Sequence, residues 1–364
     1  MSAHFFVPTN VHGMDVYQWN HGIKGICYLT ITWSGGVLHA PSKNSLMAWK
    51  NMMFKASRTK DKEAIWQALD QYGADVSIEV DQSRVLLHVS CVAERMLSVW
   101  PIVLECLSEA VFTEQEWSMT QQRLVAQKKA SRDQLEVIAS EVLCQQLYPK
   151  GHIGHIEEYN DSILALESLS IAELDDVHQL MVNRHDMRVF IAGVLPSDWV
   201  QSTLVMDLMS LSENKVASSR YAVHVPDAKP MKVQQELSSK QTATVVWGKV
   251  LDISPKHPDY PAVLLANYML GGNFTAHLMQ KVRDQQGLTY GIYSSLSGFS
   301  YGLPGMWCVR ASFSPGQYEQ GLLATEAEIA SWQHAISSET VEQSIQSWLG
   351  AKRVSMASIS MVLR

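Results

Sequence analysis

The sequence predicts an α+β protein built from two homologous domains, each an antiparallel-rich mixed sheet covered by helices. Three observations predict this class. Short runs of β-branched and aromatic residues alternate with helical stretches, neighbouring strands follow each other closely enough to form hairpins, and the same order of elements occurs twice. Because hairpins pair their strands antiparallel, we expect helices on one face of each sheet.

The first copy of this order is expected to occupy residues 1–215. Its first clear strand, 26–33 (ICYLTITW), is rich in β-branched and aromatic side chains, and Asn44 is expected to cap the helix that follows. The later elements are expected to be a helix over 62–72, a hairpin over 74–80 and 83–91, a helical stretch over 93–110, a long helix over 113–147, a helix opened by the capping box Ser170–Glu173, and a strand over 187–195.

Residues 216–241 are expected to be a linker, because they are polar, contain Pro226 and Pro230 and lack a helical period. The order of elements then restarts in a second domain over 242–364. Its elements are expected to be a strand over 242–250, helices over 258–270 and 273–286, a hairpin over 288–296 and 305–313, and helices from 315 and 338.

The second copy is shorter than the first. Relative to a complete repeat, about 50 to 70 residues are absent after its long helix, so we expect a truncated second domain. A naturally shorter domain is the alternative.

Composition excludes several classes of function. The chain is 46% hydrophobic and 18% charged, which is typical of a soluble globular protein, and its net charge of -7 argues against a nucleic-acid surface. No apolar run reaches the ~20 residues that span a membrane. No signal peptide is visible at the start, so we expect a cytoplasmic protein, or a periplasmic one if a leader was removed. The five cysteines have long spacings and are expected to be free thiols.

The most specific segment surrounds Gly287, with Arg283 and Tyr290 seven residues apart on either side of it. It follows the run ANYMLGG over 266–272, which ends in a Gly-Gly turn that we expect to end a helix. This order resembles the second domain of the pitrilysin/insulinase family of zinc peptidases, whose members include mitochondrial processing peptidase and have the LuxS/MPP-like metallohydrolase fold. The resemblance implies that Arg283 and Tyr290 bind the substrate peptide.

The resemblance extends over nearly the whole chain, including MMFK at 52–55. The position of the family's zinc-binding motif, called the zinc slot below, lacks the zinc ligands in this chain. Active members carry H-x-x-E-H directly before that stretch, where two histidines four apart share a helical face and bind zinc. Here the slot contains Met47, Lys50 and Asn51, and the third ligand position on the long helix falls near Gln127. A thioether, an ammonium and two amides make a poor zinc site. We therefore expect no metal or cofactor on this chain.

Another stretch with two histidines, His152 and His155, looks superficially like a metal site. Two glycines in this short stretch argue against a helix that would align the histidines, so we expect a surface loop.

The resemblance implies a zinc-less subunit of a heterodimeric pitrilysin-type metallopeptidase, inactive alone, whose partner is a homologous peptidase subunit that carries the zinc. Arg283 and Tyr290 would contact the bound peptide. The alternative from another class is a non-enzymatic assembly or peptide-binding protein of the same fold. A third interpretation, an independent zinc peptidase, requires a metal site that the sequence does not show.

Overall fold

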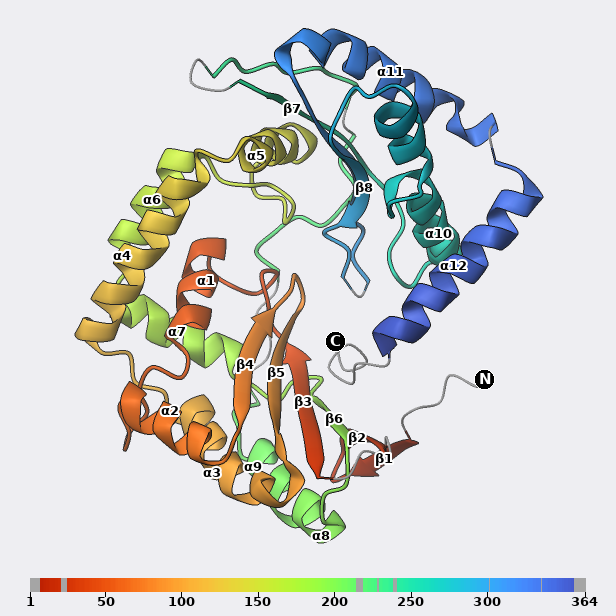
Figure 1. Cartoon of the computed structure of the whole chain (residues 1–364). Coiled ribbons are helices and arrows are strands. Elements are labelled where there is room, and N and C mark those ends of the chain that lie inside the picture. Colours follow the sequence, from red (N-terminus) through yellow and green to blue (C-terminus); the bar gives the residue numbers. More distant parts are fainter. Residues whose placement is uncertain are drawn as a thin grey trace. The chain divides into compact units, whose positions relative to one another are not determined.

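The computed structural model describes residues 7–20, 25–213, 219–227, 229–237, 241–300, 302–334 and 336–356. The chain divides into two compact units. Unit 1 comprises Met1–Gln127, Tyr159–Arg220 and Met356–Arg364, and unit 2 comprises Lys128–Glu158 and Tyr221–Ser355. The α+β class is confirmed, with a mixed sheet in unit 1 and an antiparallel sheet in unit 2, each packed against helices (Figure 1).

Unit 1 is built on a six-stranded mixed sheet in which only β2 and β6 pair in parallel. In sheet order the strands are β1 (Val7–Val11), β2 (Met14–Trp19), β6 (Arg188–Ala192), β3 (Ile26–Ser34), β5 (Arg84–Val92) and β4 (Asp75–Val80). The expected hairpin of β4 and β5 is confirmed, with Val80 opposite Val85 next to its turn. The central strand β3 is almost wholly buried, which explains its run of β-branched and aromatic residues.

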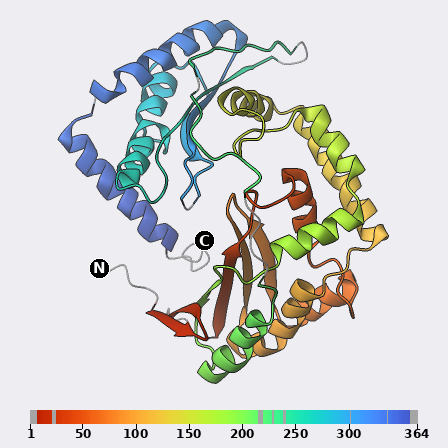
Figure 2. The same ribbon diagram turned by 180° about the vertical axis from the view of Figure 1, so that it is seen from behind.

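Eight α-helices of unit 1 pack around this sheet in the described residues (Figures 1 and 2). They are α1 (Lys43–Met52), α2 (Lys62–Gln71), α3 (Met96–Ser108), α4 (Glu114–Ser131), α6 (Tyr159–Ser168), α7 (Ile171–Met181), α8 (Ser197–Trp199) and α9 (Val205–Met209). A 3-10 turn, η1 (Ala93–Arg95), precedes α3, and a π-helical turn, η2 (Val200–Leu204), joins α8 to α9. The capping box of Ser170 and Glu173 at the start of α7 is confirmed.

Unit 2 repeats the central part of this plan. Its sheet has the order β7 (Ala243–Val250), β9 (Met306–Phe313), β8 (Ile292–Ser297), with both pairs antiparallel. This matches the order β3-β5-β4 of unit 1, so the internal repeat predicted from sequence is confirmed at the level of topology. The helical elements are α5 (Leu135–Leu147), α10 (Tyr260–Gly271), the π-helical η3 (Met279–Gln285), η4 (Pro315–Gln317), α11 (Tyr318–Ser331), η5 (Trp332–His334) and α12 (Ser338–Met356).

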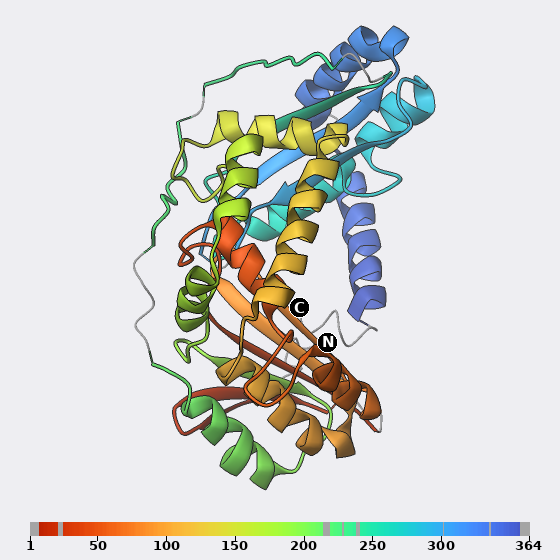
Figure 3. The ribbon, with the colours of Figure 1, turned by 90° about the vertical axis from the view of Figure 1, so that its left-hand side faces the viewer.

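The expected continuous helix over 113–147 is wrong. It is two helices, α4 and α5, separated by residues 132–134, whose backbone N–H groups bond to carbonyls three residues earlier. After the break, α5 lies along β7, within unit 2 (Figure 3). The ranges 1–215 and 242–364 therefore remain a prediction of domain organisation, while packing places residues 128–158 with the second sheet.

Two further boundaries in unit 2 differ from expectation. The strand expected from 288 begins at Ile292, because the Thr289 hydroxyl accepts from the Gly291 N–H and donates to the Ser312 carbonyl. The helix expected from 273 starts later, because Asn273 Oδ1 accepts from the Thr275 N–H and holds a turn there. Gly272 provides the C-cap of α10, as the Gly-Gly pair predicts.

Gly248 lies at the contact between α5 and β7. A Cβ built at Gly248 would lie 2.6 Å from Leu143 Cδ2 on α5, so a larger residue there would force the Leu143 side chain to shift. Leu143 and its neighbours Leu147, Tyr148 and Met306 form the small apolar cluster on this face of the sheet. The close approach therefore holds α5 to unit 2.

We predict that Gly248→Val lowers the free energy of unfolding by about 1–3 kcal/mol, the usual cost of overpacking. Valine favours strands, so any loss must come from the collision with Leu143 rather than from strand propensity. Urea denaturation measures the change. The matched control is Gly316→Ala, since a Cβ at Gly316 meets nothing within 4 Å. Equal stability of Gly248→Val and the parent would contradict the proposed role of this contact.

Candidate functional site

The helix that carries the degenerate zinc slot, α1, is capped by Ser42 rather than by Asn44. Ser42 Oγ accepts from the Ser45 N–H at 3.0 Å and Ser45 Oγ accepts from the Ser42 N–H at 3.2 Å, a reciprocal capping box. Asn44 is instead buried, and its Oδ1 accepts from the Ser162 hydroxyl of α6 at 3.1 Å. The expected cap was therefore misplaced by two residues, because Asn44 is used to bind a neighbouring helix.

Trp49 fixes the rotation of α1. Its side chain is fully buried, and its indole N–H donates to His178 Nδ1 of α7 at 3.1 Å. Burial lowers the pKa of His178 to about 4, so the ring is neutral near pH 7 and can accept this hydrogen bond. With Trp49 directed into the core, the opposite face of α1 is turned to solvent.

The slot residues lie on this solvent face. Met47 and Lys50 are exposed and Asn51 is partly exposed, which is the arrangement expected for positions three and four apart on one helix. Asn51 Nδ2 donates to the Met47 carbonyl at 2.8 Å, and Asn51 Oδ1 accepts from Arg123 of α4 at 2.7 Å. The slot is thus closed by a hydrogen bond between α1 and a guanidinium.

Arg123 is the functional residue that sequence reasoning missed. Gln127 was expected at the third ligand position, but the side chain that reaches the slot belongs to Arg123, one helical turn earlier. Spacing along a long helix cannot distinguish two residues four apart on the same face. The one signal in the sequence was the positive charge of Arg123, because a guanidinium cannot be a metal ligand.

The donor set does not fit zinc. Met47 offers a thioether, Lys50 an ammonium, Asn51 an amide already bonded on both of its ends, and Arg123 adds a permanent positive charge. Within the described ranges, no group of three or more His, Cys, Asp or Glu residues could hold a metal ion. No catalytic step through a metal on this chain is therefore derived.

Arg283 and Tyr290 are placed at a sharp reversal of the chain in unit 2. Arg283 lies in η3, whose buried residues Met279 and Val282 anchor it in the core of the unit. Gly287 follows with φ +64°, and the backbone then enters the segment before β8. The reversal leaves the side chains of both Arg283 and Tyr290 on the surface.

Neither of these two side chains is held in place by contacts with the core. Tyr290 is 98% exposed, and Arg283 has one ion-pair contact, at 3.4 Å, with the adjacent exposed Asp284. Two further aromatic rings lie nearby in the chain: Phe274, 72% exposed, packs edge-on against Tyr293 with 6.4 Å between ring centroids. The segment therefore presents free hydrogen-bond donors beside exposed aromatic surface, and the role of Arg283 and Tyr290 in binding a peptide stays a prediction.

The His152–His155 loop is not on the surface, so that expectation was wrong. Both histidines are buried, at 4% and 6% exposure. His152 Nδ1 accepts from the Gly154 N–H, so Nε2 carries the proton and donates to the His224 carbonyl at 2.9 Å. The ring also stacks on Tyr148 at 4.7 Å. Through this hydrogen bond and this stacking contact, His152 connects the linker to the end of α5.

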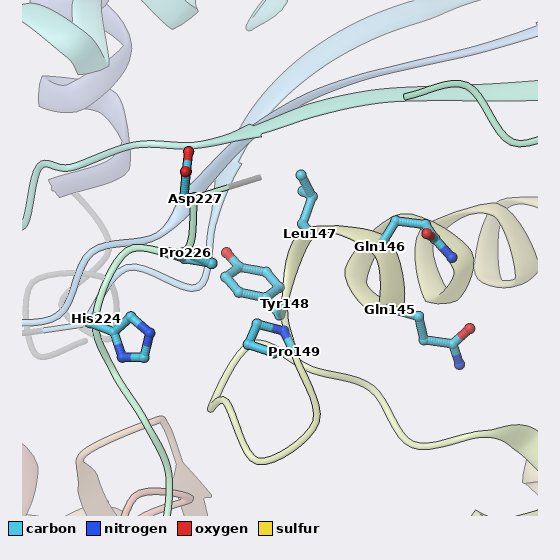
Figure 4. A pocket seen from close by; sticks show the side chains of 8 residues that line it. All are labelled: Gln145, Gln146, Leu147, Tyr148, Pro149, His224, Pro226 and Asp227. Atoms are coloured by element: carbon cyan, nitrogen blue, oxygen red, sulfur yellow. The ribbon is translucent and has the colours of Figure 1, made fainter. Parts of the chain in front are cut away.

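A pocket of about 380 Å³ lies beside Tyr148 and His224. Figure 4 shows the Tyr148 ring between the end of α5 and the linker residues. Its walls are Gln145, Gln146, Leu147, Tyr148, Pro149, His224, Pro226 and Asp227. None of the residues predicted for binding or catalysis lines it.

The comparisons with known proteins agree with the resemblance stated from the sequence. Residues 168–347 match the family described as "Peptidase M16 inactive domain". This chain is a relative of the M16 peptidases. The pitrilysin/insulinase resemblance is thereby confirmed.

Two curated relatives extend the match across most of the chain. One is the "Uncharacterized zinc protease YmxG" of Bacillus subtilis, 20% identical over 312 residues that cover 85% of this chain and 73% of the relative. The other is the "Non-peptidase homolog YmxG" of Helicobacter pylori, 20% identical over 336 residues that cover 91% of this chain and 72% of the relative. A crystal structure of a peptidase M16 inactive domain from Pseudomonas fluorescens has the same fold, with a TM-score of 0.82, 16% identity, and coverage of 98% of this chain and 85% of that chain.

The names of the two relatives disagree on whether they are peptidases. The slot residues of this chain agree with the second name, because the metal-binding groups are replaced by Met47, Lys50 and Asn51. The comparisons together support a non-catalytic M16-type protein. In the described residues, no helix is both long and apolar enough to span a membrane.

Arg123 gives a direct test of why the slot rejects zinc. We predict that restoring the ligands by Met47→His, Lys50→Glu, Asn51→His and Gln127→Glu gives weak zinc binding, and that adding Arg123→Ala raises the affinity at least about tenfold. Like charges about 4 Å apart repel by about 4 kcal/mol at an effective dielectric constant of about 20. Isothermal titration calorimetry with zinc measures both variants.

The matched control for this test adds Arg95→Ala, which removes an exposed cation from η1 instead. If Arg123→Ala and Arg95→Ala change the zinc affinity equally, Arg123 does not guard the slot.

The Trp49–His178 contact makes the stability of unit 1 depend on pH. The pKa of His178 is lowered from its ordinary 6.5 to about 4 in the folded state. The stabilisation from the neutral ring is therefore complete above pH ~6.5 and is lost as the pH falls towards 4, by about 3 kcal/mol in total.

We predict that His178→Gln, which keeps an acceptor for Trp49, removes this loss of stability at low pH. Urea unfolding between pH 7 and 4 measures it, with exposed His185→Gln as the control. Identical pH profiles for His178→Gln and the parent chain would contradict the assignment.

Proposed function

We propose that this chain is the zinc-less subunit of a heterodimeric M16-type peptidase, inactive alone, that binds the peptide of a zinc-bearing partner. The observation that carries the proposal is the pair Arg283 and Tyr290, exposed at a chain reversal and not engaged in the fold. Polar residues that stabilise a fold normally bond to other residues of the chain, whereas exposed donors at a chain reversal are available to a ligand.

The chemistry of the two side chains suits a peptide main chain. The Arg283 guanidinium can donate a hydrogen bond to a carbonyl oxygen, and the Tyr290 phenol can donate a second. Both donors would strengthen as negative charge develops on that oxygen in the transition state. The zinc and the general base would come from the partner, since Met47, Lys50 and Asn51 cannot supply them.

The second candidate is a peptide-binding or assembly protein without catalysis. It is favoured by the exposed aromatic pair Phe274 and Tyr293, which offers apolar surface to a ligand without any chemical role. The name of the Helicobacter relative, a non-peptidase homolog, points the same way. The two candidates differ in whether Arg283 affects turnover or only binding.

We predict that Arg283→Ala together with Tyr290→Phe lowers the kcat of a reconstituted heterodimer by roughly 100-fold, as removal of an oxyanion donor does. The parent chain alone should hydrolyse no peptide. Steady-state kinetics with a fluorogenic peptide measures the change, and zinc content and co-elution of the two subunits must stay unchanged.

The control for this prediction is Lys281→Ala, which removes a cation from the same helical segment. Full activity of the double variant, or hydrolysis by the chain alone, would overturn the proposal. A rise in KM with unchanged kcat would favour the peptide-binding candidate.

A further inference from the structure

The surface next to the degenerate slot carries more positive than negative charge. Lys55, directly after α1, and Lys62, at the start of α2, both face Glu116 of α4. Their ammonium nitrogens lie 3.7 Å and 4.0 Å from Glu116 Oε2. The side chains of Lys55 and Glu116 are only 21% and 16% exposed, so water screens this group poorly.

The backbone at Phe54 holds Lys55 in this position. Phe54 has φ +61°, a left-handed conformation that a bulky residue rarely adopts, and its ring is buried in the core. Such strain persists only where the surrounding structure fixes it. Burial and then its neighbour Lys62 lower the pKa of Lys55, and Glu116 opposes this effect only in part.

Arg123 adds a third cation two helical turns after Glu116, on the same face of α4. Its guanidinium donates to the neutral amide oxygen of Asn51, and no carboxylate of the described residues lies within 4.0 Å of it. Burial and Coulomb repulsion from Arg123 both act on Lys55. Glu116 thus pairs with two of the three cations, Lys55 and Lys62, and not with Arg123, in a protein whose net charge is -7.

Apolar surface flanks the cations. Met47 lies one turn before Asn51 on α1, and Met119 lies one turn before Arg123 on α4. Both side chains are exposed, at 38% and 48%. Flexible thioether side chains adapt to varied apolar partners, which suits a peptide more than a small inorganic anion.

We propose that the face formed by Lys55, Lys62, Arg123, Met47 and Met119 binds an acidic peptide, with a carboxylate held between Lys55 and Arg123. The bound carboxylate would receive charge-assisted hydrogen bonds from the guanidinium fork and the ammonium groups. The methionines would contact the neighbouring side chains of the peptide. The position that holds a metal in active relatives would thus be used here to bind an anion.

The inference concerns unit 1 alone and does not rest on the proposed function. It is tested on the full chain with two short Gly/Ser peptides, one with a pair of glutamates and one with glutamines at the same positions, both amidated at the C-terminus. A third peptide with a free C-terminus and no acidic side chain distinguishes a terminal carboxylate from a side-chain carboxylate. Isothermal titration calorimetry gives each affinity at low and high salt.

We expect the glutamate peptide to bind at least about tenfold more tightly than the glutamine peptide, with weaker binding at high salt. Arg123→Gln and Lys55→Gln should each weaken it about tenfold. Glu116→Gln should tighten it several-fold, because it removes the competing carboxylate, and misfolding cannot produce a gain of affinity. Exposed Arg95→Gln, an equal loss of charge elsewhere in unit 1, should leave it unchanged.

Equal affinity for the glutamate and glutamine peptides would overturn the inference, and so would weaker binding after Glu116→Gln. Binding of inorganic phosphate with the same response to the variants, but without binding of the acidic peptide, would overturn the assignment of the ligand as a carboxylate.

Discussion

The orientation of α1 is the constraint on which the chemistry of unit 1 depends. Burial of Trp49 and its hydrogen bond to neutral His178 allow only one rotation of the helix. That rotation turns Met47, Lys50 and Asn51 outward, where Asn51 meets Arg123 of α4. The exposure of the slot follows from this rotation, and the residues that fill the slot are groups that do not bind a metal.

The two units share one plan of strands but expose different side chains. In unit 1, strands in the order β3-β5-β4 accompany a helix whose exposed face carries the closed, basic slot. In unit 2, strands in the same relative order, β7-β9-β8, accompany a helical turn that exposes Arg283 next to a glycine reversal. The repeated topology therefore does not impose the same exposed residues, because exposed side chains can change without affecting the buried core.

The sequence predicted the class, the repeat and the hairpins because these follow from local pattern. The β4–β5 hairpin and the Ser170–Glu173 capping box depend on residues close together in the chain. The break between α4 and α5 was not predicted from local pattern, and α5 beyond it packs against Gly248, more than a hundred residues away.

The same reason explains the errors at the sites. Arg123 was missed because its contact to Asn51 spans 72 positions and competes with Gln127 one turn along the same helix. His152 was expected at the surface because glycines mark a loop, yet its ring is buried, stacks on Tyr148 and is hydrogen-bonded to the distant His224. In each case the deciding contact is long-range, whereas sequence pattern reports only local preference.

The central claim is that this chain supplies peptide contacts but no metal. The most direct measurement is the zinc content and peptidase activity of the natively purified protein, before and after separation from any bound subunit. The account predicts about one zinc per heterodimer, held by a partner with an intact H-x-x-E-H motif, and neither zinc nor activity on the separated chain. Stoichiometric zinc with peptide hydrolysis on this chain alone would contradict it.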